Sequence, residues 1–178
     1  MNTAKVNKLS ARGFTLVELI VVIVIIGILS IFAVPRFIDI SSDAKVASIK
    51  GIASQIEATV SLARNKARVS GLRPVTTNPA GPSGNLQPEF VVDFGFGSAE
   101  VDFRNLCPES IAENSDRLRL LDFIDISGDK IQVRVDNRYT ALGFELPASG
   151  FSTSQGCFVL YDSQSSPDCT IAIVTNTC

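Results

Sequence analysis

An unbroken apolar run, FTLVELIVVIVIIGILSIFAV over residues 14–34, constrains this chain more than any other feature. At about 1.5 Å per residue, a helix of this length would be roughly 30 Å long, enough to cross the hydrocarbon core of a bilayer. Glu18 is the single ionisable residue in the run. An unpaired carboxylate near the bilayer centre costs at least about 2.5 kcal/mol, so we expect Glu18 to serve a partner that comes from elsewhere.

A short basic leader precedes the apolar run. Residues 1–13 contain Lys5, Lys8 and Arg12 and no acidic residue, which predicts that they stay on the cytoplasmic side of a membrane and that the chain beyond residue 34 is exported. An ordinary secretory signal is cut after its apolar region, at a small-residue site. Here the small residue, Gly13, comes before the apolar region, so the arrangement differs from such a signal.

The segment GFTLVELIVVIVIIGILSIFAVP, together with this leader, resembles the class III signal of type IV pilins and pseudopilins. The resemblance implies that a prepilin peptidase cuts between Gly13 and Phe14 and that Phe14 becomes an N-methylated terminus. It also implies that Glu18 pairs with the terminal amine of Phe14 in a neighbouring subunit. Both charges would sit in an apolar setting, where an unpaired charge is costly. The alternative is an ordinary transmembrane anchor with a stray glutamate.

A second, amphipathic helical stretch follows. Pro35 removes a backbone donor and is expected to kink or loosen the helix, and Gly27 is the other predicted kink position. Beyond Pro35, apolar residues spaced by three or four mark one helix face: Ile49, Ile52, Ile56, Val60, Ala63 and Ala67. The pattern predicts a helix from Phe14 to about Lys66, a rod of roughly 80 Å whose second half alone has a solvent face.

The remaining chain predicts an antiparallel sheet. Residues 71–88 are rich in proline and glycine and predict a loop. The expected strands are 90–94, 131–136, 139–146, 157–161 and 170–175, with a turn at Asn137-Arg138 and a turn over 162–168. A short helix is expected over 115–124, with Ser115 as N-cap.

These elements amount to an α+β chain, which the resemblance identifies as a pilin fold. In this prediction the long N-terminal helix, hydrophobic and protruding in its first half, packs on a four- to five-stranded antiparallel sheet with a disulfide-bonded C-terminal region. Residues 1–13 are the expected leader peptide, residues 14–34 the transmembrane or filament-core segment, and residues 35–178 the globular head with the second half of the helix.

Four cysteines lie beyond the apolar run, at Cys107, Cys157, Cys169 and Cys178. In an exported domain, an even number of cysteines predicts two disulfides, and three pairings are possible. The resemblance favours Cys107–Cys157 with Cys169–Cys178, because similar pilins link a mid-domain helix to a late strand. The pairing Cys157–Cys178 with Cys107–Cys169 is the second choice.

Composition weighs against catalysis, cofactors and nucleic acid. The chain has no histidine, which removes the Ser-His and Cys-His nucleophiles, and no C-x-x-C zinc spacing. Carboxylate groups at Asp122, Asp125 and Asp129 lack EF-hand spacing, so a turn is expected there. The resemblance to secretion-system pseudopilins, which often carry calcium near the C-terminus, leaves calcium at Asp162, Ser163, Ser165 and Asp168 as an alternative. The expectation is no metal and no cofactor. Losing the leader removes three basic residues and no acid, so the net charge falls from −2 to −5. The basic residues Arg64, Lys66, Arg68 and Arg73 are expected to complement the helix macrodipole as a solvated helix end.

The predicted function is a structural, non-enzymatic subunit of a type IV pilus. PRFIDI at residues 35–40, followed by SSDA, and the cystine-bearing hairpin are similar to mannose-sensitive haemagglutinin pilins. The resemblance implies adhesion or biofilm attachment, a homopolymer of identical subunits, and handling by the prepilin peptidase and an inner-membrane assembly machinery. It places the chain in the inner membrane first and then in an extracellular pilus, or fimbrium. The alternatives are a type II secretion pseudopilin, a minor pilin, or a membrane-anchored exported enzyme or binding protein.

Overall fold

The computed structural model describes residues 13–79, 89–112, 115–126 and 130–178, with the backbone alone for residues 31–39. The chain divides into two compact units, residues 1–41 and residues 42–178, and each is described by itself. Helix α1 (Leu16–Val69) is the first element. In the described part of the chain, no helix reaches the length and apolar character that crossing a membrane requires.

Helix α1 begins two residues later and ends three residues later than the sequence predicts. Its end is a Schellman motif, in which the Leu72 amide donates to the carbonyl of Ala67 and the Gly71 amide to that of Arg68, both at 3.0 Å. Gly71 has a φ of +88°, the left-handed conformation that glycine adopts without a steric cost. Because Leu72 then packs back against Ala67 and its neighbours, the chain reverses at this point.

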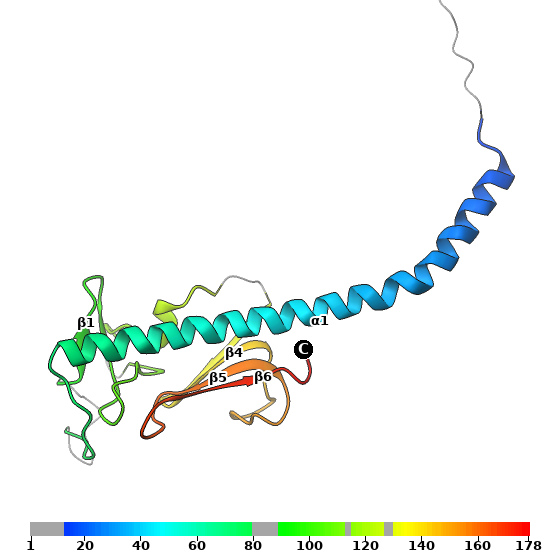
Figure 1. The fold of residues 1–178 in the computed structure, drawn as a ribbon. Coiled ribbons are helices and arrows are strands. Elements are labelled where there is room, and N and C mark those ends of the chain that lie inside the picture. The colour runs from blue at the N-terminus through cyan, green and yellow to red at the C-terminus, as the bar shows by residue number, and fades with distance from the viewer. Residues whose placement is uncertain (1–12, 80–88, 113–114, 127–129) are drawn as a thin grey trace, which may run out of the picture. The chain divides into compact units, whose positions relative to one another are not determined.

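The second unit contains a four-stranded antiparallel sheet. Its spatial order follows the sequence: β3 (Gln132–Val135), β4 (Tyr139–Glu145), β5 (Cys157–Asp162) and β6 (Thr170–Val174). The second half of α1 runs along this sheet (Figure 1). These four strands confirm four of the expected five, and the fold is the predicted pilin-like α+β arrangement.

A two-stranded hairpin precedes the sheet. It pairs β1 (Val91–Asp93), which confirms the expected strand over 90–94, with β2 (Ser98–Glu100), which the sequence did not predict. Gly95 supplies the positive φ, +88°, in the turn between them. A second apolar cluster joins this region to the last turns of α1, through Ala63 and Ala67.

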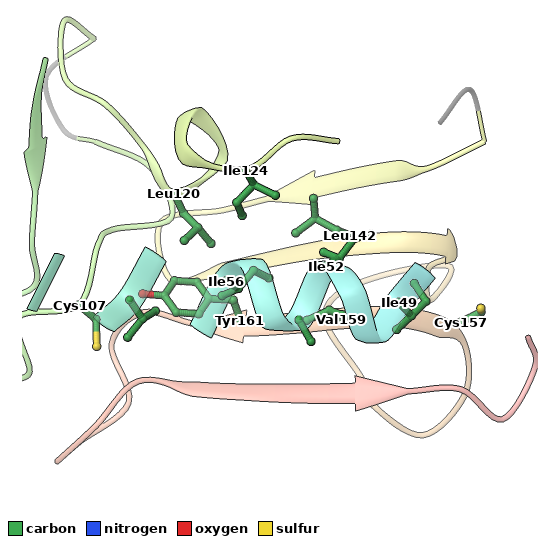
Figure 2. Packing of buried hydrophobic residues seen from close by; sticks show 12 residues of the cluster. Ile49, Ile52, Ile56, Cys107, Leu120, Ile124, Leu142, Cys157, Val159 and Tyr161 are labelled. Carbon is green, nitrogen blue, oxygen red and sulfur yellow. The ribbon is translucent and has the colours of Figure 1, made fainter. Parts of the chain in front are cut away.

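The main core lies between α1 and one face of the sheet (Figure 2). Ile49, Ile52 and Ile56 project from successive turns of the helix toward Leu142, Val159 and Tyr161 on β4 and β5. All six predicted face positions of the helix are buried, at 8% exposure or less. The 3.6-residue periodicity therefore identified the buried face correctly.

The opposite face of the sheet carries a third cluster, of Ala141, Phe158, Leu160 and Val174, partly covered by Phe151 from the β4–β5 connection. The ring centroids of Phe151 and Tyr139 are 5.1 Å apart. Both faces of β5 are consequently buried. This explains why its sequence, CFVLYD, is nearly continuous in apolar residues and does not alternate.

The predicted helix over 115–124 is wrong in extent. The structure has only a 3₁₀ turn, η1 (Leu120–Phe123), and its N-cap is Arg119 and not Ser115. The reason is that neighbouring backbone takes the amides an α-helix would use. Leu118 donates to the carbonyl of Ser98, at 2.8 Å, and Leu120 donates to that of Glu109, at 3.1 Å.

Candidate functional site

The predicted cleavage position lies just before α1. Gly13 and Phe14 lie outside the helix and are exposed, and the Phe14 side chain is 74% accessible. A Cβ placed on Gly13 would meet no atom within 4 Å. The chain's own fold therefore does not require glycine at this position, and any requirement for it must come from another molecule.

Thr15 and Glu18 form a capping box at the start of α1. The carboxylate Oε2 of Glu18 accepts the Thr15 amide, at 3.0 Å, and the Thr15 hydroxyl, at 2.7 Å. In return the Glu18 amide donates to the Thr15 Oγ1, at 3.2 Å. This arrangement satisfies two amides that a helix start leaves unpaired. The T-x-x-E spacing could have revealed it in the sequence, where we considered Glu18 only for an intermolecular pair.

An apolar surface surrounds this cap. In the first unit, the large apolar side chains between residues 16 and 29 are 43–72% exposed, on every side of the helix. Water alone is a poor environment for a continuous surface of this kind, which ordinarily marks a protein or membrane interface. Glu18 is the only carboxylate among residues 14–30.

The two predicted kink positions differ in what the structure describes. Gly27 lies inside α1 with open space beside it, and its carbonyl accepts the hydroxyl of Ser30, at 2.7 Å. Pro35 also falls within the helix bounds, but its side chain lies outside the described residues. A kink at either residue stays a prediction.

The disulfides follow the second of the two pairings weighed from the sequence. Cys107 is bonded to Cys169, and Cys157 to Cys178, so the preferred pairing was wrong. The register of the strands explains the outcome. Cys157 begins β5 close to where the chain ends after β6, whereas Cys169 lies at the other end of this hairpin, against the segment that carries Cys107.

Three of the carboxylates weighed for calcium, Asp122, Asp162 and Asp168, are paired with arginine side chains. Asp162 binds the guanidinium of Arg138 through both oxygens, at 2.8 and 2.7 Å, and Asp168 pairs with Arg64. Asp122 accepts the Arg119 amide, at 2.7 Å. Asp129 lies outside the described residues. Among the residues the structure describes, no three carboxylate, cysteine or histidine side chains gather as metal ligands would.

Two of the four basic residues near the end of α1, Arg64 and Arg73, make separate contacts. Arg64 turns to Asp168. Arg73 turns back to the helix end, where its Nη1 donates to the carbonyl of Leu72, at 3.0 Å, and lies 3.4 Å from that of Arg68. A cation at the carboxyl end of a helix complements the macrodipole, as the sequence predicted.

Sequence reasoning missed a group of hydrogen bonds that fixes the turn between β5 and β6. The buried side chain of Asn105 donates to the carbonyls of Ser163 and Ser165, both at 2.8 Å, and accepts the Cys107 amide. The carbonyl of Arg138 accepts the hydroxyls of Ser110 and Ser163. Apart from the local contact between Asn105 and Cys107, these hydrogen bonds join residues 25 to 60 positions apart, so no local sequence pattern predicts them.

Comparison with known proteins gives two matches. The family described as the prokaryotic N-terminal methylation motif matches residues 8–34, which include Gly13, Phe14 and Glu18. The type IV narrow pilus major component PilA5 of Thermus thermophilus is 42% identical over 74 residues, or 41% of this chain and 64% of the relative. No solved structure matches. The chain thus carries a prokaryotic N-terminal methylation motif and a pilin-like α+β fold, and over 74 residues it is similar to a type IV pilus component.

Proposed function

We propose that this chain is a structural subunit of a type IV pilus. The observation that carries the proposal is the methylation motif over residues 8–34, followed by a helix with apolar side chains exposed on every side and a disulfide-bonded head. The similarity to a major pilus component supports it. The role is structural and not enzymatic.

The proposed assembly begins with a cut between Gly13 and Phe14. The prepilin peptidase removes residues 1–13, Phe14 is N-methylated, and residues 14–34 hold the subunit in the inner membrane. In the filament the same apolar segment is covered by other copies of the chain, and the Glu18 carboxylate receives the Phe14 ammonium of a neighbour. A buried ion pair of this kind specifies one register, because any other register leaves a charge unpaired.

At a finer level we propose an adhesive pilus of the mannose-sensitive haemagglutinin type, which serves surface attachment and biofilm formation. The supporting observations are the PRFIDI segment at residues 35–40 and the C-terminal hairpin closed by Cys157–Cys178. A type II secretion pseudopilin and a minor pilin are the alternatives that share the same N-terminal motif.

The decisive experiment is to shear filaments from the producing bacterium and identify their main protein by mass spectrometry and immunogold electron microscopy. We expect long surface fibres composed mainly of this chain, beginning at a methylated Phe14. Short fibres that never leave the envelope would indicate a pseudopilin, and traces of the chain in fibres of another protein would indicate a minor pilin. Unpolymerised protein alone would contradict the proposal.

A further inference from the structure

The four-stranded sheet of the head ends in two open edges. β3 and β6 are its outermost strands, on either side of β4 and β5 (Figure 2). In an antiparallel ladder, successive residues point their amide and carbonyl groups alternately toward one neighbouring strand and away from it. Each outer strand therefore leaves the backbone groups of every second residue without a strand partner, and such an edge is a template for a further strand.

The register identifies the unpaired residues of β3. The Asp136 amide donates to the carbonyl of Tyr139, at 2.9 Å, so position 136 faces β4. By alternation, the amide and carbonyl groups of Val133 and Val135 point away from β4. In the part of the chain that the structure describes, neither residue has another backbone hydrogen-bond partner.

The same reasoning gives the unpaired residues of β6. The Ser163 amide donates to the carbonyl of Arg138, at 3.0 Å, which fixes the alternation along β5. Through the β5–β6 register, the backbone groups of Ile171 and Ile173 point to the open side of the sheet. Among the described residues they too have no other backbone partner.

Neither edge carries the usual protection against pairing with another chain. Natural edges are blocked by charged side chains, by prolines or by bulges. β6 has five residues, TIAIV, with no charge and no proline. The one charge on β3, Arg134, is turned to its own chain, where its Nη1 donates to the carbonyls of Pro147 and Gly150, at 2.6 and 3.0 Å.

The side chains at the two edges match as well. Val133 is 43% exposed and Ile173 is 45% exposed, although both lie in regular strands. They lie on the same face of the sheet, because they are opposite Leu142 and Val159, which pack against α1 in the main core. Each edge thus offers two residues with free backbone groups and one exposed apolar side chain.

The strand directions allow the two edges to meet between copies of the chain. With four antiparallel strands, β3 and β6 run in opposite directions. A second copy in the same orientation can therefore lay its β3 antiparallel to β6 of the first copy. The second half of α1 then lies on the same face of the joint sheet in both copies and runs in the same direction. A contact of two different surfaces, repeated in this way, builds an open filament when the rotation does not close.

We propose that β6 of one copy pairs with β3 of the next, with Ile173 opposite Val133, so that neighbouring heads share one antiparallel sheet. The inference rests on the proposed function, since it makes the second copy a neighbouring subunit of the filament. It adds a contact between heads that is separate from the one between Glu18 and Phe14.

The first test is disulfide crosslinking in intact sheared filaments of the full-length chain. Val133→Cys and Ile173→Cys are made singly and together, because directly opposite residues of an antiparallel pair have Cα atoms about 4.5 to 5.5 Å apart, within reach of a disulfide. We expect the double variant to give a ladder of multimers on a non-reducing gel after iodoacetamide treatment, and each single variant to stay monomeric.

Thr170→Cys combined with Val133→Cys is the matched control, since Thr170 is exposed on β6 but its backbone faces β5. This control should give no ladder. A monomeric Val133→Cys, Ile173→Cys double variant would overturn the inference. Dimers from Ile173→Cys alone would also overturn it, because they would mean that β6 pairs with β6 of a reversed copy.

The second test removes a donor at the open edge. Ile173→Pro deletes an amide that serves no bond inside the sheet, so the head should still fold and form both disulfides. Ile173→Thr keeps the amide and a β-branched side chain. We expect the amount of subunit in filaments, divided by the cleaved subunit left in the membrane, to fall about five- to tenfold in Ile173→Pro and to stay within about twofold in Ile173→Thr.

The two tests separate this inference from the function on which it rests. If the wild type forms long fibres and Ile173→Pro forms them equally well, the pairing of sheet edges fails and the pilus function stands. If the wild type forms no fibres of this chain, the pilus function fails and the edge contact falls with it.

Discussion

At Gly13, a requirement of the fold can be distinguished from a requirement of the proposed cleavage. Its missing Cβ has open space on all sides, so a valine there would disturb no contact of the folded chain. We predict that Gly13→Val reaches the membrane and forms both disulfides but stays uncut, because a peptidase subsite shaped for glycine excludes a branched side chain. Mass spectrometry should find the chain beginning at or near Met1. A mature chain beginning at Phe14 in this variant would contradict the prediction.

Asp102 gives the head a distinctive pH dependence. Its side chain is 1% exposed, and burial raises the pKa of the carboxyl above its ordinary value, helped by the nearby charge of Asp162 and opposed by the bonds from Arg104. The folded state therefore binds this proton more tightly than the unfolded state. Protonation of Asp102 adds stability as the pH falls through the folded pKa, and this contribution is lost as the pH rises.

The corresponding test compares wild type with Asp102→Asn in denaturant unfolding between pH 7 and pH 4, in detergent. The amide of the variant cannot titrate, so the free energy of unfolding of the wild type should improve relative to the variant as the pH is lowered. The prediction is the direction in which the difference in unfolding free energy between wild type and variant changes with pH. The other carboxylates titrate in both proteins, so their effect cancels in this difference. A difference that is constant, or that moves toward the variant, would show that the charged form is the one the fold favours.

At the scale of elements, β4 and β5 approach so closely that one position admits only glycine. A Cβ on Gly143 would overlap the carbonyl oxygen of Cys157 and the Cα of Phe158, and neither backbone atom can move aside, next to a bulge between Gly143 and Glu145. We predict that Gly143→Ala lowers the free energy of unfolding by about 3 kcal/mol. Gly51, inside α1 with open space around it, is the matched control. Gly51→Ala should be neutral or stabilising, by up to about 1 kcal/mol, in the same denaturant titration.

The two disulfides should differ in their contribution because they close loops of different length. The sequence separations are 62 residues for Cys107–Cys169 and 21 for Cys157–Cys178. Chain entropy predicts that replacing both cysteines by alanine costs about 4 kcal/mol for the first pair and about 3 kcal/mol for the second. Urea unfolding of the two double variants measures the order. The reverse order would mean that native packing at the chain end outweighs loop closure.

An element could be predicted from the sequence where its residues repeat in a pattern that its own segment contains. The spacing of Ile49, Ile52 and Ile56 located the buried helix face, and alternation located β3, because each pattern follows from the geometry of its own segment. β2 is three residues long and offers no pattern. The helix expected from Ser115 failed because Leu118 and Leu120 pair with backbone at Ser98 and Glu109, which the local sequence cannot show. The disulfide pairing depended in the same way on strand register.

At the scale of the whole molecule, the N-terminal motif and the head differ in how much of them the sequence reveals. The residues around Gly13 and Glu18 could be recognised because they form one linear motif, and the methylation-motif family matches there. The head offers no comparable linear signal. Its turn is held by Asn105 and by the pair Arg138–Asp162, which only the folded chain brings together. The proposed processing and assembly are therefore easier to infer from the sequence than the surface of the head.

The last prediction concerns Glu18 in the assembled filament. Removing one member of a buried ion pair leaves the other uncompensated, at a cost of roughly 3 to 5 kcal/mol, and in a filament this cost recurs at every subunit. Glu18→Ala should therefore abolish or severely shorten pili, while the subunit is still cleaved, inserted and folded with both disulfides. Glu18→Asp, one methylene shorter, should be intermediate, since its carboxylate reaches less far toward the ammonium. Separating sheared filaments from membrane-held subunit measures both effects. A wild-type filament yield from Glu18→Ala would show that the carboxylate has no part in assembly, and loss of the subunit itself would place its role earlier, in targeting or stability.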